Sequence, residues 1–159
     1  WSWYRPEDLG VPGVVMPTRA EIANMTWQGV AAGANGVCFY SYGAIARYAQ
    51  PEKRAGYWED VCAVAREVRA AEDVLLWADE TQAVTGAPTA LEVRSWRLNG
   101  RDCVLAVNRT REPVKAMLSL PYMVARLKTV CGGGASVCDG RLEIGFAGLG
   151  YTLVSVEER

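Results

Sequence analysis

The stretch PTRAEIANMTWQGVAAGANGVCFYSY, residues 17–42, begins with a strong helix signal. Thr18 is a favourable N-cap, and Glu21 three positions later completes a capping-box pattern. Apolar and small residues then recur near one face at helical spacing. Gly33 can end the helix because glycine readily adopts a left-handed conformation. The stretch therefore predicts a helix over residues 17–32.

The second part of this stretch, VCFYSY at residues 37–42, is almost continuously apolar or aromatic. It follows Asn35-Gly36, a pair that favours a turn. A run of this kind suits a strand that is covered on both faces, as in a parallel sheet. Alternation along the strand would place Tyr40 and Tyr42 on one side and Ser41 on the other.

A second helix is predicted over residues 57–76, after a loop at residues 43–56. Charged residues occupy mainly its outer faces. The order helix, buried strand, helix is part of an alternating β/α arrangement. Apolar residues at helical spacing indicate the face that packs on a core, namely Trp58, Val61, Cys62, Ala65, Val68 and Leu75.

The pattern changes after Gly86, where short strands alternate with turns. Asn99-Gly100 is a strong hairpin signal between strands predicted at residues 91–98 and 103–107. Strands of this length separated by turns indicate an antiparallel sandwich or barrel-like module. We place the domain boundary in the polar region 79–89, which gives domains at residues 1–80 and 81–159. Further strands are predicted at residues 114–120, 126–131, 141–146 and 151–156.

Composition excludes several classes of function. The 159 residues are 50% hydrophobic and 22% charged, the profile of a packed chain. With 17 basic and 18 acidic residues the net charge is −1, so we expect no nucleic-acid partner. No apolar run reaches the roughly 20 residues that a bilayer requires, so we expect no membrane partner either.

Histidine is absent, which excludes Ser-His-Asp and Cys-His catalysis within these residues. None of the five cysteines belongs to a C-x-x-C pair. We therefore predict no metal site and no cofactor. The cysteines are expected to be small buried hydrophobes or free thiols. A bridge between Cys131 and Cys138 stays open as an alternative.

Two segments match the N-glycosylation sequon. They are Asn24-Met25-Thr26 and Asn108-Arg109-Thr110. The match carries weight only in a eukaryotic secretory context, and Asn24 falls inside a predicted helix.

Several phrases of the sequence resemble the C-terminal end of barrel-type glycoside hydrolases. The segment PTRAEI…GVAAGANGVCFYSY is similar to the last outer helix and eighth strand of a (β/α)8 barrel, and YWEDVCAVAREVRAAEDVLL is similar to the eighth helix. VRSWRLNGRDCVLAVNRTREPVKAMLSLP resembles the first strands of an appended sandwich, and DGRLEIGFAGLGYTLVSVE resembles its closing hairpin. The resemblance covers most of the chain.

The resemblance implies a mixed fold, α/β plus all-β. The incomplete end of a TIM-type barrel, ordered helix-strand-helix, would be followed by a C-terminal antiparallel β-sandwich. A full barrel needs about 250 residues, so only its last part would be present. The opening WSWY also begins abruptly, and we expect a piece of a longer chain. Apolar surfaces left by the missing part would bind the remainder of the barrel or drive self-association.

The implied activity is hydrolysis of an O-glycosyl bond by a pair of carboxylates. By resemblance these carboxylates lie at the ends of the fourth and seventh strands, upstream of this chain. We therefore expect no catalytic residue here, and expect the chain by itself to be inactive. The partner would be a carbohydrate substrate. The compartment is undecided, and a secreted or a periplasmic parent is compatible with the activity.

Candidate sugar-binding residues lie where barrel active sites open, at the carboxyl ends of strands. Aromatic rings stack on sugar faces and Arg5 could bind hydroxyls. The competing interpretation is loop packing near the N-terminus and core packing for the two later tyrosines. The candidates are Trp1, Trp3, Tyr4, Arg5, Tyr40 and Tyr42.

A second hypothesis is a noncatalytic carbohydrate-binding or structural β-sandwich module. Such modules bind sugars with exposed aromatic side chains, and Trp96 is the aromatic residue of the sandwich that could do so. The competing and favoured interpretation places Trp96 in the sandwich core.

Overall fold

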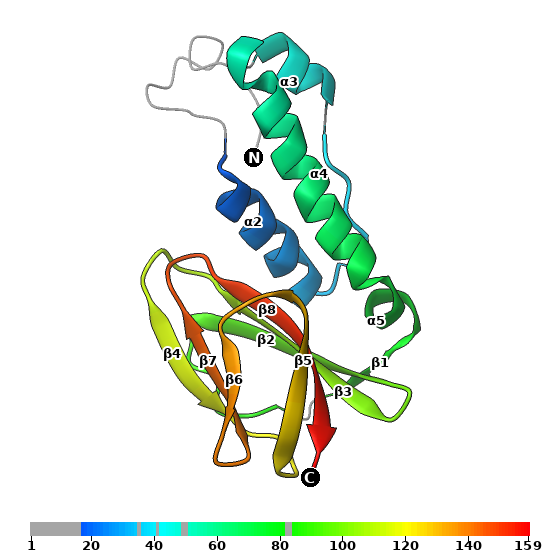
Figure 1. The fold of residues 1–159 in the computed structure, drawn as a ribbon, viewed down its shortest axis with the longest axis vertical. Helices are drawn as coiled ribbons and strands as arrows, with labels where there is room; N and C mark the ends of the chain where they lie inside the picture. The colour runs from blue at the N-terminus through cyan, green and yellow to red at the C-terminus, as the bar shows by residue number, and fades with distance from the viewer. Residues whose placement is uncertain (1–16, 35, 41, 49–50, 82–83) are drawn as a thin grey trace.

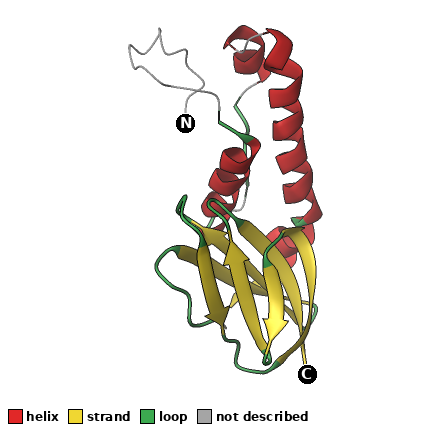
Figure 2. Cartoon of the chain, turned by 60° about the vertical axis from the view of Figure 1, so that its left-hand side comes forward, coloured by secondary structure: helices red, strands yellow, loops and turns green. Residues whose placement is uncertain are grey.

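The computed structural model describes residues 17–34, 36–40, 42–48, 51–81 and 84–159. The structure has two antiparallel sheets, and the helices pack on the outer face of the five-stranded one (Figures 1 and 2). The helices are α2 (Arg19–Ala31), α3 (Tyr42–Tyr48), η1 (Pro51–Lys53), α4 (Arg54–Ala70) and α5 (Glu72–Trp77). The strands are β1 (Asp79–Thr81), β2 (Leu91–Leu98), β3 (Arg101–Asn108), β4 (Val114–Leu118), β5 (Val124–Gly132), β6 (Ala135–Cys138), β7 (Arg141–Phe146) and β8 (Tyr151–Glu158).

The first predicted helix is confirmed as α2, with its capping box. The backbone N–H of Glu21 donates to the Thr18 hydroxyl over 3.3 Å, and the Thr18 N–H donates to the Glu21 carboxylate over 2.8 Å. Gly33 has a φ of 108° immediately after the helix. Its N–H donates to the Val30 carbonyl over 3.0 Å. The local signals therefore set both ends of α2.

The predicted hairpin is also confirmed. Asn99 and Gly100 both have positive φ, 52° and 78°, as a two-residue primed turn requires. All eight residues of β2 pair with β3. The other predicted strands form as well, as β4, β5, β7 and β8. Two strands were not predicted: β1, which lies in the expected boundary region, and the four-residue β6.

The strands form a five-stranded sheet, in the order β1-β2-β3-β8-β5, and a three-stranded sheet, β4-β7-β6. Alternate residues of β3 serve two separate cores. Leu105 and Val107 pack with the helices, whereas Val104 and Ala106 pack between the sheets. The central strand is thus buried on both faces, and its sequence is continuously apolar for that reason.

The strand predicted at residues 37–42 is wrong. Residues 36–40 form no strand, and Tyr42 begins α3. A strand needs neighbours to receive its backbone hydrogen bonds, and no described strand pairs with this segment. Tyr40 and Tyr42 are 79% and 60% exposed, so neither packs in a core among the described residues.

The loop and the long helix predicted after it also differ from the structure. Residues 43–56 hold most of α3, all of η1 and the start of α4. The predicted helix over 57–76 is divided at Ala71, which is fully buried. The Ala71 N–H donates to the carbonyls of both Glu67 and Val68, so the helix tightens there and turns into α5.

The described structure thus contains helices together with two antiparallel sheets. The predicted boundary between residues 80 and 81 falls inside β1, which pairs with β2. The helical part and the five-stranded sheet also share one apolar cluster. The division into two domains stays a prediction.

Helix α2 is fixed on the outer face of the five-stranded sheet by apolar contact. Ile22, Trp27 and Val30 pack in one cluster with Leu105 and Leu153 of the sheet. The Trp27 ring is fully buried and stacks on Tyr151, with 5.9 Å between ring centroids. The Nε1 of Trp27 has no hydrogen-bond partner in the described structure. A buried donor without a partner lowers the free energy of unfolding by about 1–3 kcal/mol. Burying an indole of this size raises it by roughly 4–6 kcal/mol, so the net effect of Trp27 is stabilising.

Polar contacts then orient α2. Asn24, which is 2% exposed, donates from Nδ2 to the carbonyls of Asn108 (2.8 Å) and Leu149 (3.0 Å). At the end of the helix, Arg94 donates to the Val30 carbonyl over 2.9 Å. A helix placed on an apolar sheet by hydrophobic burial alone could slide, whereas these directional bonds fix its position.

Both asparagines of the glycosylation sequons are buried. Asn108 is fully buried, and its side chain donates to the Glu112 carbonyl (2.7 Å) and accepts from the Thr110 N–H (3.0 Å). Neither Asn24 nor Asn108 is therefore accessible to a glycosyltransferase in the folded chain. Both residues have structural roles, one in docking α2 and one in ordering the turn after β3.

We expect Asn24→Ala to lower the free energy of unfolding by about 1–3 kcal/mol, because the buried carbonyl of Asn108 and the partly buried carbonyl of Leu149 lose their donor. Urea denaturation of the whole chain measures this difference. Gln28→Ala is the comparison variant, since it removes only the bond that the Asn24 side chain accepts and keeps both bonds that Asn24 donates, so it should cost less than Asn24→Ala. Equal stability of Asn24→Ala and wild type would contradict the role given to Asn24.

Candidate functional site

The predicted sugar-binding residues are only partly described by the structure. Trp1, Trp3, Tyr4 and Arg5 lie outside the described residues. Tyr40 and Tyr42 are described, and both are largely exposed.

Tyr42 lies against an aromatic residue that was assigned to the core. The rings of Tyr42 and Trp58 meet edge to face, with 5.0 Å between centroids. Trp58 is 39% exposed, although its spacing predicted a core-facing position. We call Tyr40, Tyr42 and Trp58 the aromatic surface. Residues 36–40, drawn in light blue to cyan, lead from the end of α2 toward α3 (Figure 1).

The aromatic surface has the chemistry of a stacking site. Tyrosine and tryptophan rings offer flat apolar faces to the C–H groups of a sugar, and the tyrosine hydroxyls can donate and accept hydrogen bonds. α3 and the start of α4 lie at the end of the helical part that is remote from the sheets (Figure 1). The sandwich therefore leaves these aromatic residues uncovered.

A second candidate site lies where β2 and β3 meet their turn. Arg97 and Asp102 are cross-strand partners next to Asn99-Gly100. Arg97 donates to both carboxylate oxygens of Asp102, from Nε over 2.9 Å and from Nη2 over 2.8 Å. The Tyr122 hydroxyl donates to the same carboxylate over 2.5 Å. A signal for the Arg97–Asp102 pair was present in the sequence, since a two-residue hairpin turn places opposite charges in register. Tyr122, 20 residues away, carried no such signal.

The Asp102 carboxylate is stabilised in its charged form. Its side chain is only 1% exposed. Hydrogen bonds from Arg97 lower the pKa of Asp102 and outweigh the opposing effect of burial, and the bond from Tyr122 adds to them. Burial, together with the Asp102 carboxylate, raises the pKa of Tyr122 well above its usual value. The group therefore carries a fixed ion pair beside a neutral phenol at physiological pH.

A third polar group belongs to the contact between helices and sheet. Tyr151 of β8 donates its hydroxyl to Glu67 of α4, and Arg19 of α2 donates to Glu67 over 3.1 Å. Cys131 lies near this group, and burial raises the pKa of its thiol to about 12. A thiol with such a pKa is unreactive at neutral pH. We assign these residues to the attachment of the helices.

The five cysteines are all free thiols, so the alternative of a Cys131–Cys138 bridge is wrong. Cys103 and Cys131 are buried as expected of small hydrophobes, whereas Cys38 and Cys138 are exposed. Within the described ranges, no group of three His, Cys, Asp or Glu side chains could hold a metal ion. None of the described helices has the length and apolar character needed to cross a bilayer.

Comparison with protein-family models, with curated proteins and with solved structures gave no match to this chain.

We call Arg97, Asp102 and Tyr122 the Asp102 group. This group makes the free energy of unfolding fall as the pH is lowered into the acid range. Because folding lowers the pKa of Asp102, its stabilisation is complete above about pH 4, the ordinary pKa of an unfolded aspartate, and is lost as the pH falls through the folded value. We expect Asp102→Asn to lose about 1–2 kcal/mol at pH 7, a modest effect because Arg97 is half-exposed. The difference from wild type should shrink below pH 4.

Urea unfolding between pH 2.5 and pH 7 measures both effects. Asp139→Asn is the matched control and should leave stability unchanged, because Asp139 is exposed in a turn and asparagine also adopts its left-handed backbone conformation. A loss for Asp102→Asn that is the same at every pH would show that the charge of Asp102 is not the cause.

Proposed function

We propose that this chain is the C-terminal part of a glycoside hydrolase. Its helices would complete the end of the catalytic barrel, and the sandwich would hold them in place. Tyr40 and Tyr42 would form part of the wall of a sugar-binding cleft. The carboxylate pair that cleaves the O-glycosyl bond would come from the rest of the protein.

The observation that carries the proposal is the exposure of the aromatic surface. Tyr40 and Tyr42 are 79% and 60% exposed, and Trp58 packs edge-on against Tyr42. Exposed aromatic residues at neighbouring positions are costly in water unless a ligand or a partner covers them. Sugar rings are ligands that such a surface fits, since aromatic faces cover their C–H groups.

The arrangement of the helices gives further support. One face of α2 is buried against the sandwich and is not accessible to other partners. Val37, at 37% exposure, adds to the apolar character of the segment that leads to Tyr40. Both observations agree with a helical layer whose remaining surface is covered by other barrel elements or by a second copy of the chain.

The alternative of a noncatalytic sugar-binding module loses its first candidate residue. Trp96 is 6% exposed and packs in the cluster shared with the helices, not between the two sheets. It has no open ring face for a sugar. A sandwich site would have to use other residues, and the Asp102 group is a candidate among the described residues.

Kinetics of the complete protein that includes this chain test the proposal. We expect Tyr40→Ala or Tyr42→Ala to raise KM for a cleaved oligosaccharide by about two- to tenfold, the value of one aromatic contact. kcat should change little, because a wall contact serves the ground state and the transition state alike.

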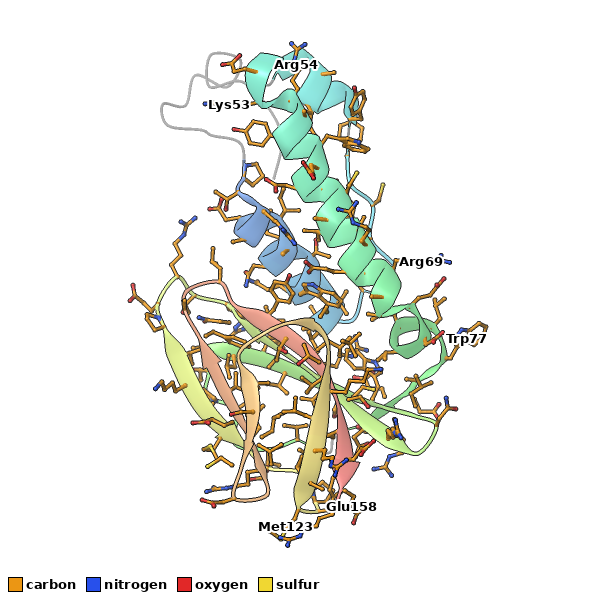
Figure 3. All side chains as sticks on the ribbon, in the orientation of Figure 1. Lys53, Arg54, Arg69, Trp77, Met123 and Glu158 are labelled. Carbon is orange, nitrogen blue, oxygen red and sulfur yellow. The ribbon has the colours of Figure 1, made fainter. Side chains whose placement is uncertain are left out.

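Trp77→Ala is the matched control. Trp77 is 74% exposed, but it lies on α5 and points away from the chain at the end of the helical part near the sheets (Figure 3). It should leave KM unchanged. Absence of glycoside hydrolysis, or equal KM values for all variants, would contradict the proposal.

A further inference from the structure

A cavity of about 390 Å³ opens beside the Asp102 group, within the size range of small-ligand sites. It is lined by the turn residue Gly100, by Arg97 and Asp102, by Tyr122 from the loop before β5, and by the end of β8 with Glu158. Glu158 lies at the end of the sandwich farthest from the helices (Figure 3). The cavity is therefore separate from the aromatic surface.

Donors and acceptors are held ready at this cavity. Asp102 occupies Nε and one N–H of Nη2 of Arg97, which leaves three of the five guanidinium N–H groups for a ligand. The Glu158 side chain is exposed and makes no direct hydrogen bond or ion pair within the described part of the chain, but its charge reaches Arg97, whose pKa is raised chiefly by Asp102 and also by Glu158. A fixed cationic donor and an exposed anionic acceptor thus border one cavity, beside a tyrosine.

The charges at the cavity select against ionic ligands. Two arginines, Arg97 and Arg101, stand against three carboxylates, Asp102, Glu157 and Glu158, so the lining carries a net charge of −1. Arg101 is itself paired with Glu157 over 3.1 Å. A strong anion would meet the charge of Glu158, and a metal cation would meet Arg97. A neutral molecule with many hydroxyls has no such conflict, because each hydroxyl can accept from a guanidinium and donate to a carboxylate.

We propose that this cavity binds a neutral sugar, and that the sandwich thereby carries a carbohydrate site of its own. Arg97 donates to ligand hydroxyls and Glu158 accepts from them. Asp102 and Tyr122 position the guanidinium and do not need to contact the ligand. The site does not depend on the proposed hydrolase activity, since no residue of the aromatic surface takes part in it.

Titration of the whole chain tests the site. Glucose, galactose, mannose and xylose serve as probes, and the backbone amide signal of Gly100 in NMR spectra reports on the cavity. We expect at least one sugar to shift this signal saturably. Glu158→Ala should weaken its binding by about tenfold, as loss of a charged hydrogen-bond acceptor implies. Arg97→Lys keeps the charge beside Asp102 but loses the planar fork, and should weaken binding as well.

Glu112→Ala is the matched control, an exposed glutamate in the turn after β3 that should leave sugar binding unchanged. Phosphate and calcium chloride are tested in parallel. The proposal is overturned if no sugar shifts the Gly100 signal, if Glu158→Ala binds sugar as wild type does, or if only phosphate or calcium binds. None of these results would alter the kinetics expected for Tyr40→Ala, so the two proposals fail separately.

Discussion

The burial of β3 on both faces is the constraint on which the rest of the structure depends. The three-stranded sheet covers one face, and α2 covers the other with Ile22, Trp27 and Val30. Without α2, Leu105, Val107 and Leu153 would lie exposed in the middle of the five-stranded sheet. Hydrophobic burial holds the helix there, and Asn24 fixes its position by donating to the carbonyls of Asn108 and Leu149.

This constraint separates the two candidate sites. The helices cover the outer face of the five-stranded sheet, and the cavity bordered by Arg97, Asp102 and Glu158 lies at the free end of the sandwich. Tyr42 and Trp58 of the aromatic surface lie on α3 and the start of α4, at the opposite end of the described structure (Figure 1). Rigid attachment through α2 would let the sandwich support a cleft at a distance without entering it.

Local signals in the sequence predicted much of the fold. The capping box of Thr18 and Glu21 and the Asn99-Gly100 turn depend only on neighbouring residues, and both form as predicted. Residues 37–42 failed because an apolar run states only that a segment can be buried, whereas a strand also needs partners. The prediction that Trp58 faces the core failed for a similar reason. Its spacing along the helix matches that of core residues, but this part of α4 extends past the sheet, and Trp58 is 39% exposed. Only part of the Asp102 group could be predicted from the sequence. The hairpin predicts that Asp102 pairs with Arg97, whereas the contact with Tyr122 depends on tertiary packing.

Native-state hydrogen exchange measures, residue by residue, whether α2 and the sandwich unfold as one cooperative unit. We expect the slowest amides of α2, around Trp27 and Val30, to exchange only in the global unfolding that also exposes Leu105 and Val107 of β3. Their opening free energies would then be equal and would fall together in urea. Exchange of the α2 amides through a separate opening, several kcal/mol below that of β3, would contradict the account.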